Sequence, residues 1–353
     1  MSTPNSKSLW YVIAHQKKLN SKEYIKLINR VTAFVVLAFV FSVIVFAVVV
    51  FVGGGGSVIS AIASSNLGIY SIAFVLIFLS LLVRFIKWSY YIHKFRLKLP
   101  LLRSLAIYLS MYSMDLTPGN MGRVVSAYTL SKTTTARTAQ VIPIVTMDIF
   151  TDSLGFALLT FVTAFYFNQL TIPVLIADIL LLLPVFMFLI SPWFYNKMKN
   201  FLRNHDFFRR FSIYGDEYFA SQSVLNRWDV YLVSILVSVP AALLQTLAFF
   251  IALAALGINV PLGHTIFVSS TSQLFGMVST IPGNLGIMDA GLIGFSQQIL
   301  GVTSTQASSA TIMMRIATLW FTIAIGGVFL FYTLRYWKIQ REALFKKTKG
   351  MVT

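Results

Sequence analysis

The stretch that decides the fold is Pro118-Gly119-Asn120-Met121-Gly122, which the chain repeats as Pro282-Gly283-Asn284-Leu285-Gly286. Each copy interrupts an otherwise apolar run. Proline and glycine break helices, and non-helical backbone persists inside a membrane only where protein buries it or a wet cavity solvates it. Two such breaks in corresponding places are typical of transporters built from repeats, in which the binding site lies at the breaks.

The composition predicts an all-α polytopic membrane protein. Hydrophobic residues make up 57% of the chain and charged residues 11%, with a mean hydropathy of +0.78, whereas soluble domains carry about 25% charged residues. The 353 residues contain no long polar block, so we expect no soluble catalytic domain and no enzyme. Cysteine is absent, and the four histidines have no metal-ligand spacing. The sequence therefore predicts no catalytic residue, cofactor or metal.

The apolar runs predict about six full spans, over residues 31–51, 69–85, 139–165, 171–190, 230–256 and 310–331. The motifs fall in two further elements, 101–130 and 265–302, which we predict to be broken, re-entrant helical hairpins. Residues 31–333 then form a single transmembrane domain. Basic tails cover 1–30 and 334–353, and residues 191–229 form an amphipathic cytoplasmic connection.

The net charge of +17 indicates orientation rather than a nucleic-acid partner. With both termini cytoplasmic, every Lys and Arg except Arg315 falls on the cytoplasmic face of the cell membrane, including Arg84 and Lys87 at the polar end of the second span. This threading makes the two broken elements enter from opposite sides. Residues 69–165 and 230–331 are therefore predicted to form an inverted repeat, with a site where the broken helices meet.

A helix that begins after each motif would point free N–H groups into the membrane interior, where phosphate binds well; a tight turn is the alternative. Asp148 and Asp152 share a helix face. We expect them, Asp289 and Arg315 either to form buried salt bridges or to contact a lipid headgroup. The candidate substrate-binding residues are Pro118, Gly119, Asn120, Gly122, Arg123, Asp148, Asp152, Pro282, Gly283, Asn284, Gly286, Asp289 and Arg315.

Two further carboxylates receive structural interpretations. Asp115, which precedes the first motif, is expected to cap a helix. Asp178 belongs to no motif, and snorkelling or packing accounts for it best.

The chain resembles the transmembrane region of bacterial lysylphosphatidylglycerol synthases and the stand-alone flippase-like proteins related to it. The resemblance rests on the order and spacing of Thr117–Arg123, Ala127–Leu130, Asp148, Asp152, Pro282–Ala290 and Arg315. Compared with the common family pattern, Arg123 and Asp289 stand in place of glutamates and Ile149 in place of an arginine. The resemblance implies movement of a polar lipid, such as an aminoacylated phospholipid or a polyprenyl-linked sugar, between leaflets. Without the aminoacyl-transferring domain, it does not imply lipid synthesis.

We therefore predict a lipid translocase whose substrate headgroup passes through a polar cavity at the repeat interface. One alternative is a membrane-embedded transferase for a lipid-linked substrate, with His264, Asp206, Asp216 or Glu217 as candidate groups. Another is a proton-coupled solute transporter in which Asp148 and Asp152 carry protons. The expected partner is an anionic or phosphate-bearing membrane lipid; a homo-oligomer and a separate lipid-modifying enzyme are further candidates.

Overall fold

The computed structural model describes residues 40–117, 123–134, 136–165, 218, 220–279, 281–333 and 335, with a few positions between 172 and 180. The elements in this part of the chain are helices, and four are long and apolar enough to cross a membrane. They are α4 (Leu67–Lys94), α7 (Thr138–Ala164), α11 (Trp228–Ala255) and the helix Ser304–Thr333, which contains α14 (Ser304–Arg315) and η4 (Ile316–Trp320). A helix over Val40–Val52 and α3 (Gly56–Ala63) form a pair bent by 96°, which is a fifth candidate span. The chain is thus a multi-pass membrane protein.

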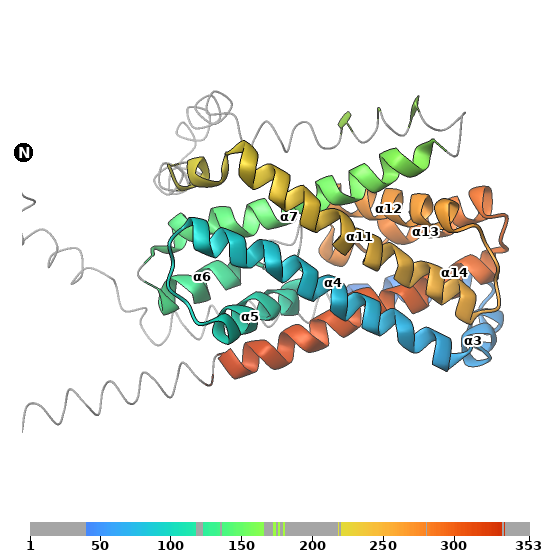
Figure 1. Ribbon diagram of the computed structural model, residues 1–353. Coiled ribbons are helices and arrows are strands. Elements are labelled where there is room, and N and C mark those ends of the chain that lie inside the picture. The colour runs from blue at the N-terminus through green and yellow to red at the C-terminus, as the bar shows by residue number, and fades with distance from the viewer. Residues whose placement is uncertain are drawn as a thin grey trace, which may run out of the picture.

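α7 is the central helix of the bundle. In its most apolar stretch 67% of the residues are buried, compared with 28–39% in the other three spans. α4 and α11 run side by side and both pack on α7 (Figure 1). Their outer faces expose apolar side chains, among them Val75, Ile86 and Leu236, as expected for lipid-facing surface. Polar side chains on the inner faces therefore lie away from the bilayer.

Glycines allow close helix contacts at two crossings. A Cβ atom added at Gly155 of α7 would lie 2.8 Å from the carbonyl oxygen of Ser238 on α11. One added at Gly326 would overlap the backbone nitrogen of Ser113. Small residues allow such close backbone approach between membrane helices. These contacts fix the spacing of the helices that surround the interior.

Two broken elements are inserted among the spans. The first comprises α5 (Leu101–Ser110), η1 (Met111–Met114) and α6 (Val124–Thr133), and its motif, residues 118–122, lies outside the described residues. The second comprises α12 (Leu262–Val278), η3 (Pro282–Asn284) and α13 (Ile287–Ile299), and α12 packs against α13. In Figure 1 the α5–α6 pair lies toward one end of the bundle and the α12–α13 pair toward the other.

The second motif breaks the helix as predicted. Gly283, Asn284 and Gly286 have φ values of 63°, 56° and 83°, in the left-handed region that glycine and asparagine tolerate best. Leu285 of this motif packs in one apolar cluster with Leu116 and Leu319. The second motif therefore touches the first broken element just after η1.

Some predicted boundaries differ from the structure. The second span was predicted to end at Phe85, but α4 continues to Lys94, and residues 52–68, between the first two predicted spans, contain α3. The continuation follows from the apolar and aromatic residues after Phe85, whose burial inside the bundle outweighs the basic residues among them. The basic tails, residues 31–39 of the first span and most of 171–190 and 191–229 lie outside the described residues.

Candidate functional site

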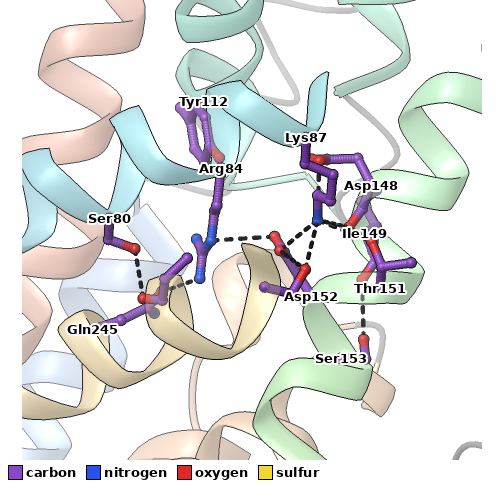
Figure 2. Close-up of polar contacts among 12 residues, drawn as sticks. Ser80, Arg84, Lys87, Tyr112, Asp148, Ile149, Thr151, Asp152, Ser153 and Gln245 are labelled. Carbon is purple, nitrogen blue, oxygen red and sulfur yellow. Dashed lines mark hydrogen bonds and ion pairs between the residues drawn. The ribbon is translucent and has the colours of Figure 1, made fainter. Parts of the chain in front are cut away.

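The first charged cluster joins α4 to α7. Lys87 Nζ lies 2.7 Å from Asp152 Oδ1, and Arg84 Nε lies 3.4 Å from Asp152 Oδ2. Figure 2 shows Arg84 and Lys87 extending from α4 toward Asp152 from two sides. Both residues, which the sequence placed at the polar end of the second span, lie within α4 and are buried, at 6% and 0% exposure. Their charges are compensated by carboxylates, as buried charges require.

Asp148 and Asp152 face the same cluster but are held differently. Lys87 Nζ donates to Asp152 Oδ1, Thr151 Oγ1, Ser238 Oγ and the backbone oxygen of Asp148, at 2.7–3.0 Å. The ammonium group also lies 3.2 Å from Asp148 Oδ1. That pairing is electrostatic only, because neither carboxylate oxygen of Asp148 accepts a hydrogen bond within the described part of the chain. An ammonium has three protons, and its other acceptors already use them.

Arg123 forms the second ion pair, with Asp115. Its Nε and Nη2 donate to the two carboxylate oxygens of Asp115 at 2.7 and 3.0 Å, and its guanidinium lies 4.6 Å from the centre of the Tyr112 ring. Whether Asp115 also caps a helix depends on residues 118–122, which lie outside the described residues. Its pair with Arg123 has two hydrogen bonds between charged partners, which makes it a strong contact.

Arg315 forms the third pair and holds the second motif in place. It donates to both oxygens of Asp289, at 2.6 and 3.1 Å, and to the backbone oxygens of Gly283 and Asn284, at 3.1 and 2.8 Å. Asp289 in turn accepts from the backbone N–H of Gly286 at the start of α13, at 2.8 Å. Immediately after Arg315 the helix widens into the π-turn η4, a feature frequent at functional sites.

The three arginines line one open cavity between the broken elements. Its volume is about 530 Å³, counting the space at its mouth. It is lined by Arg84, Asp115, Arg123, Asp152, Phe156, Gln245, Gln273, Met277, Gly283, Asn284, Arg315, Thr318 and Leu319. A second cavity of about 300 Å³ shares Arg84, Asp115, Arg123, Gln245 and Thr318 with the first.

Several polar groups on the cavity wall are available to a ligand. Gln273 Nε2 and Asn284 Oδ1 are buried and have no hydrogen-bond partner among the described residues. Arg84 donates to Gln245 through Nη2 alone, and Arg123 uses Nε and Nη2, so Nη1 of both has no partner in the same part of the structure. Arg315, in contrast, makes four hydrogen bonds with its guanidinium. Arg84 and Arg123 are thus the arginines most able to bind an anion.

The structure brings together most of the predicted site residues that it describes. Arg123, Asp152, Gly283, Asn284 and Arg315 line the cavity. Asp148 and Asp289 do not line it, but each lies within 3.2 Å of a buried cation. Pro282 and Gly286 belong to the backbone turn that Arg315 fixes, whereas Pro118–Gly122 and Asp178 lie outside the described residues.

Sequence reasoning missed Arg84, Lys87, Gln245 and Gln273. A signal for the first two is present, because Arg84 and Lys87 are three residues apart and thus on one helix face, within a run that stays apolar and aromatic up to Tyr91. For the two glutamines no comparable signal exists, since a single amide inside an apolar helix is also common at packing contacts.

These features define a multi-pass membrane protein with a charged cavity between two broken helical elements. The sequence profile of the lysylphosphatidylglycerol synthase TM region matches residues 35–326, and the chain therefore belongs to this family. It is also similar to a UPF0104 membrane protein of Methanothermobacter thermautotrophicus, with 26% identity over 87 residues. That match spans 25% of this chain and 26% of the relative, about a quarter of each.

Proposed function

We propose that this protein moves a lipid with a phosphate-bearing headgroup between the leaflets of the cell membrane. The observation that carries the proposal is the convergence of Arg84, Arg123 and Arg315 on one cavity inside the bundle. Charges inside a membrane protein are costly and usually functional. Arginine is well suited to phosphate because its planar N–H groups match two oxygens at once.

A lipid is favoured over a fully soluble substrate because the polar cavity lies within a bundle whose outer faces expose apolar side chains. The headgroup would occupy the polar space between the broken elements while its acyl or prenyl chains stay in the bilayer beside the apolar outer faces. Gln273 and Asn284 add amide atoms without a hydrogen-bond partner among the described residues to the arginine N–H groups of the cavity. A headgroup with phosphate and hydroxyl groups would hydrogen-bond to both the arginines and the amides. An aminoacylated phospholipid or a polyprenyl-linked sugar has this chemistry.

An inverted repeat would provide the route between leaflets. We propose that 69–165 and 230–331 are two halves of opposite orientation, each with a re-entrant hairpin, within about six spans and with both termini cytoplasmic. The placement of α5–α6 and α12–α13 toward opposite ends of the bundle supports this (Figure 1). In such folds, rocking of one half against the other opens a midplane site alternately to each side.

We further propose that the cavity binds its substrate without changing it chemically. A transferase would need a free general base beside the lipid. The two carboxylates that line the cavity, Asp115 and Asp152, are each held by an arginine or lysine at 2.7 Å. A carboxylate that compensates a buried cation is a poor proton acceptor.

The test is lipid exchange in liposomes that contain the purified protein. An anionic phospholipid with a fluorophore on its headgroup is incorporated, and a membrane-impermeant quencher reports how much of it reaches the outer leaflet. We expect faster exchange than in protein-free liposomes, a loss in Arg84→Gln and wild-type rates in Lys98→Gln, which alters an exposed residue outside the cavity. Exchange no faster than in protein-free liposomes, for phospholipid and polyprenyl-linked substrates alike, would refute the proposal.

A further inference from the structure

The buried charges of the described chain are balanced in number but not in hydrogen bonding. They comprise four cations, Arg84, Lys87, Arg123 and Arg315, and four carboxylates, Asp115, Asp148, Asp152 and Asp289. Three of the carboxylates accept hydrogen bonds from a buried cation. The fourth, Asp148, is fully buried and accepts none from the described residues. An ionised carboxylate in such a place lacks the donors that compensate for lost hydration.

The charge state of Asp148 sets the net charge around the cavity. With all four carboxylates ionised, four positive and four negative charges sum to zero. With Asp148 neutral, the same groups sum to +1. A cavity with one surplus positive charge attracts a single phosphodiester anion, whereas a balanced cavity gains little by admitting one.

We propose that Asp148 is a proton-binding site that is protonated in the empty cavity and stays protonated beside a bound anionic headgroup, so that proton and headgroup move together. This inference rests on the proposed function and adds its coupling ion. The proton comes from water and forms an O–H bond on Asp148. No other bond changes. With Asp148 neutral and the headgroup anion bound, the charges in and around the cavity sum to zero.

The surroundings of Asp148 support this assignment. Asp152, on the same helix as Asp148, forms ion pairs with Lys87 and Arg84. The other ionisable groups that interact with Asp148 are Lys87 and Tyr91 of α4, Tyr108 and Tyr112 of the first broken element, and Arg123. α11 contributes two hydroxyl groups: that of Ser234 is hydrogen-bonded to Tyr91, and that of Ser238 accepts a hydrogen bond from Lys87. Lys87 is thus the near cation, and its protons are already shared among four other acceptors.

The proton itself is tested by infrared spectroscopy of the purified full-length protein in detergent. A protonated carboxylic acid has a C=O stretching band that a carboxylate lacks. At a pH at which the exposed carboxylates are ionised, we expect such a band in the wild type, its absence in Asp148→Asn, and its shift when the aspartate carboxyl carbons are carbon-13. The labelled wild type keeps the test valid if the variant folds poorly. A wild-type spectrum without the band would overturn the proposal.

The coupling is tested by the pH dependence of ligand binding. Short-chain phosphatidylglycerol, a phosphodiester with one negative charge, is titrated into the detergent-solubilised protein at a series of pH values. Above the ionisation of Asp148 we expect wild-type affinity to fall about tenfold per pH unit, because one proton accompanies each ligand. Asp148→Asn should bind with little pH dependence.

Equal pH dependence in wild type and Asp148→Asn would refute the coupling. Failure of both to bind this lipid or a polyprenyl phosphate would instead refute the proposed function. The infrared band decides the proton site in either case, so the two failures are distinguishable.

Discussion

At the scale of single residues, Asp148 and Asp152 show how much a carboxylate depends on its donors. Both lie on one face of α7, yet Asp152 compensates Arg84 and Lys87, whereas Asp148 accepts no hydrogen bond from the described residues. Removing one partner of a buried ion pair costs about 3–5 kcal/mol. We expect Asp152→Asn to lose stability of this order and Asp148→Asn to lose about 1 kcal/mol or less. Thermal unfolding in detergent measures both, and equal losses would contradict the assignment.

Arg84 and Arg315 should separate binding from folding. Arg84→Gln leaves Asp152 paired with Lys87 but removes an N–H group available to a phosphate. A hydrogen bond to a charged group contributes about 1.5–3 kcal/mol, so lipid exchange should fall roughly 10- to 100-fold with the fold retained. Arg315→Gln removes the hydrogen bonds that Arg315 donates to the second motif and to Asp289. We expect it to lower the unfolding temperature more than Arg84→Gln does. If Arg84→Gln unfolds the protein and Arg315→Gln does not, these roles are reversed.

At the scale of elements, the bundle depends on glycine where the last span crosses η1. A Cβ atom at Gly326 would overlap Ser113, whereas one at Gly327 would meet no atom within 4 Å. Gly326→Ala should therefore destabilise the protein by about 1–3 kcal/mol through overpacking. Gly327→Ala is the matched control and should leave the unfolding temperature unchanged or slightly higher, because alanine favours the helix. Equal effects of the two variants would show that the helices at this crossing can shift to accommodate the added methyl group.

Features of the elements that depend on local sequence could be predicted, whereas those that depend on tertiary contacts could not. Proline and glycine at 282–286 predicted the break between α12 and α13, because their backbone preferences are local. The shared face of Asp148 and Asp152 followed from helical periodicity. The burial of Arg84 and Lys87 was not predicted, since it depends on α4 meeting the carboxylate face of α7, a tertiary contact. The ion pair of Asp115 was not predicted for the same reason: its partner Arg123 lies beyond the break.

At the scale of the whole molecule, the proposed topology follows from where the exposed basic residues lie. The chain has no cysteine, so single cysteines can be labelled without background. Ser64, before α4, and Lys98, after it, are both exposed. We expect a membrane-impermeant maleimide to label Ser64→Cys in intact cells and Lys98→Cys only after permeabilisation, because the loop with Lys98 is basic. The opposite pattern would reverse the orientation, and labelling of both in intact cells would exclude α4 as a span.

The central claim, that lipid headgroups cross between the two broken elements, is tested most directly by joining those elements. Leu116 and Leu285 pack in one cluster across the junction, whereas Ser272 and Gly291 touch within the second hairpin. In liposomes, oxidation of the Leu116→Cys/Leu285→Cys pair should stop lipid exchange and reduction should restore it, relative to the single variants. Oxidation of the Ser272→Cys/Gly291→Cys pair should leave exchange intact. Undiminished exchange after complete cross-linking of the first pair would contradict the account.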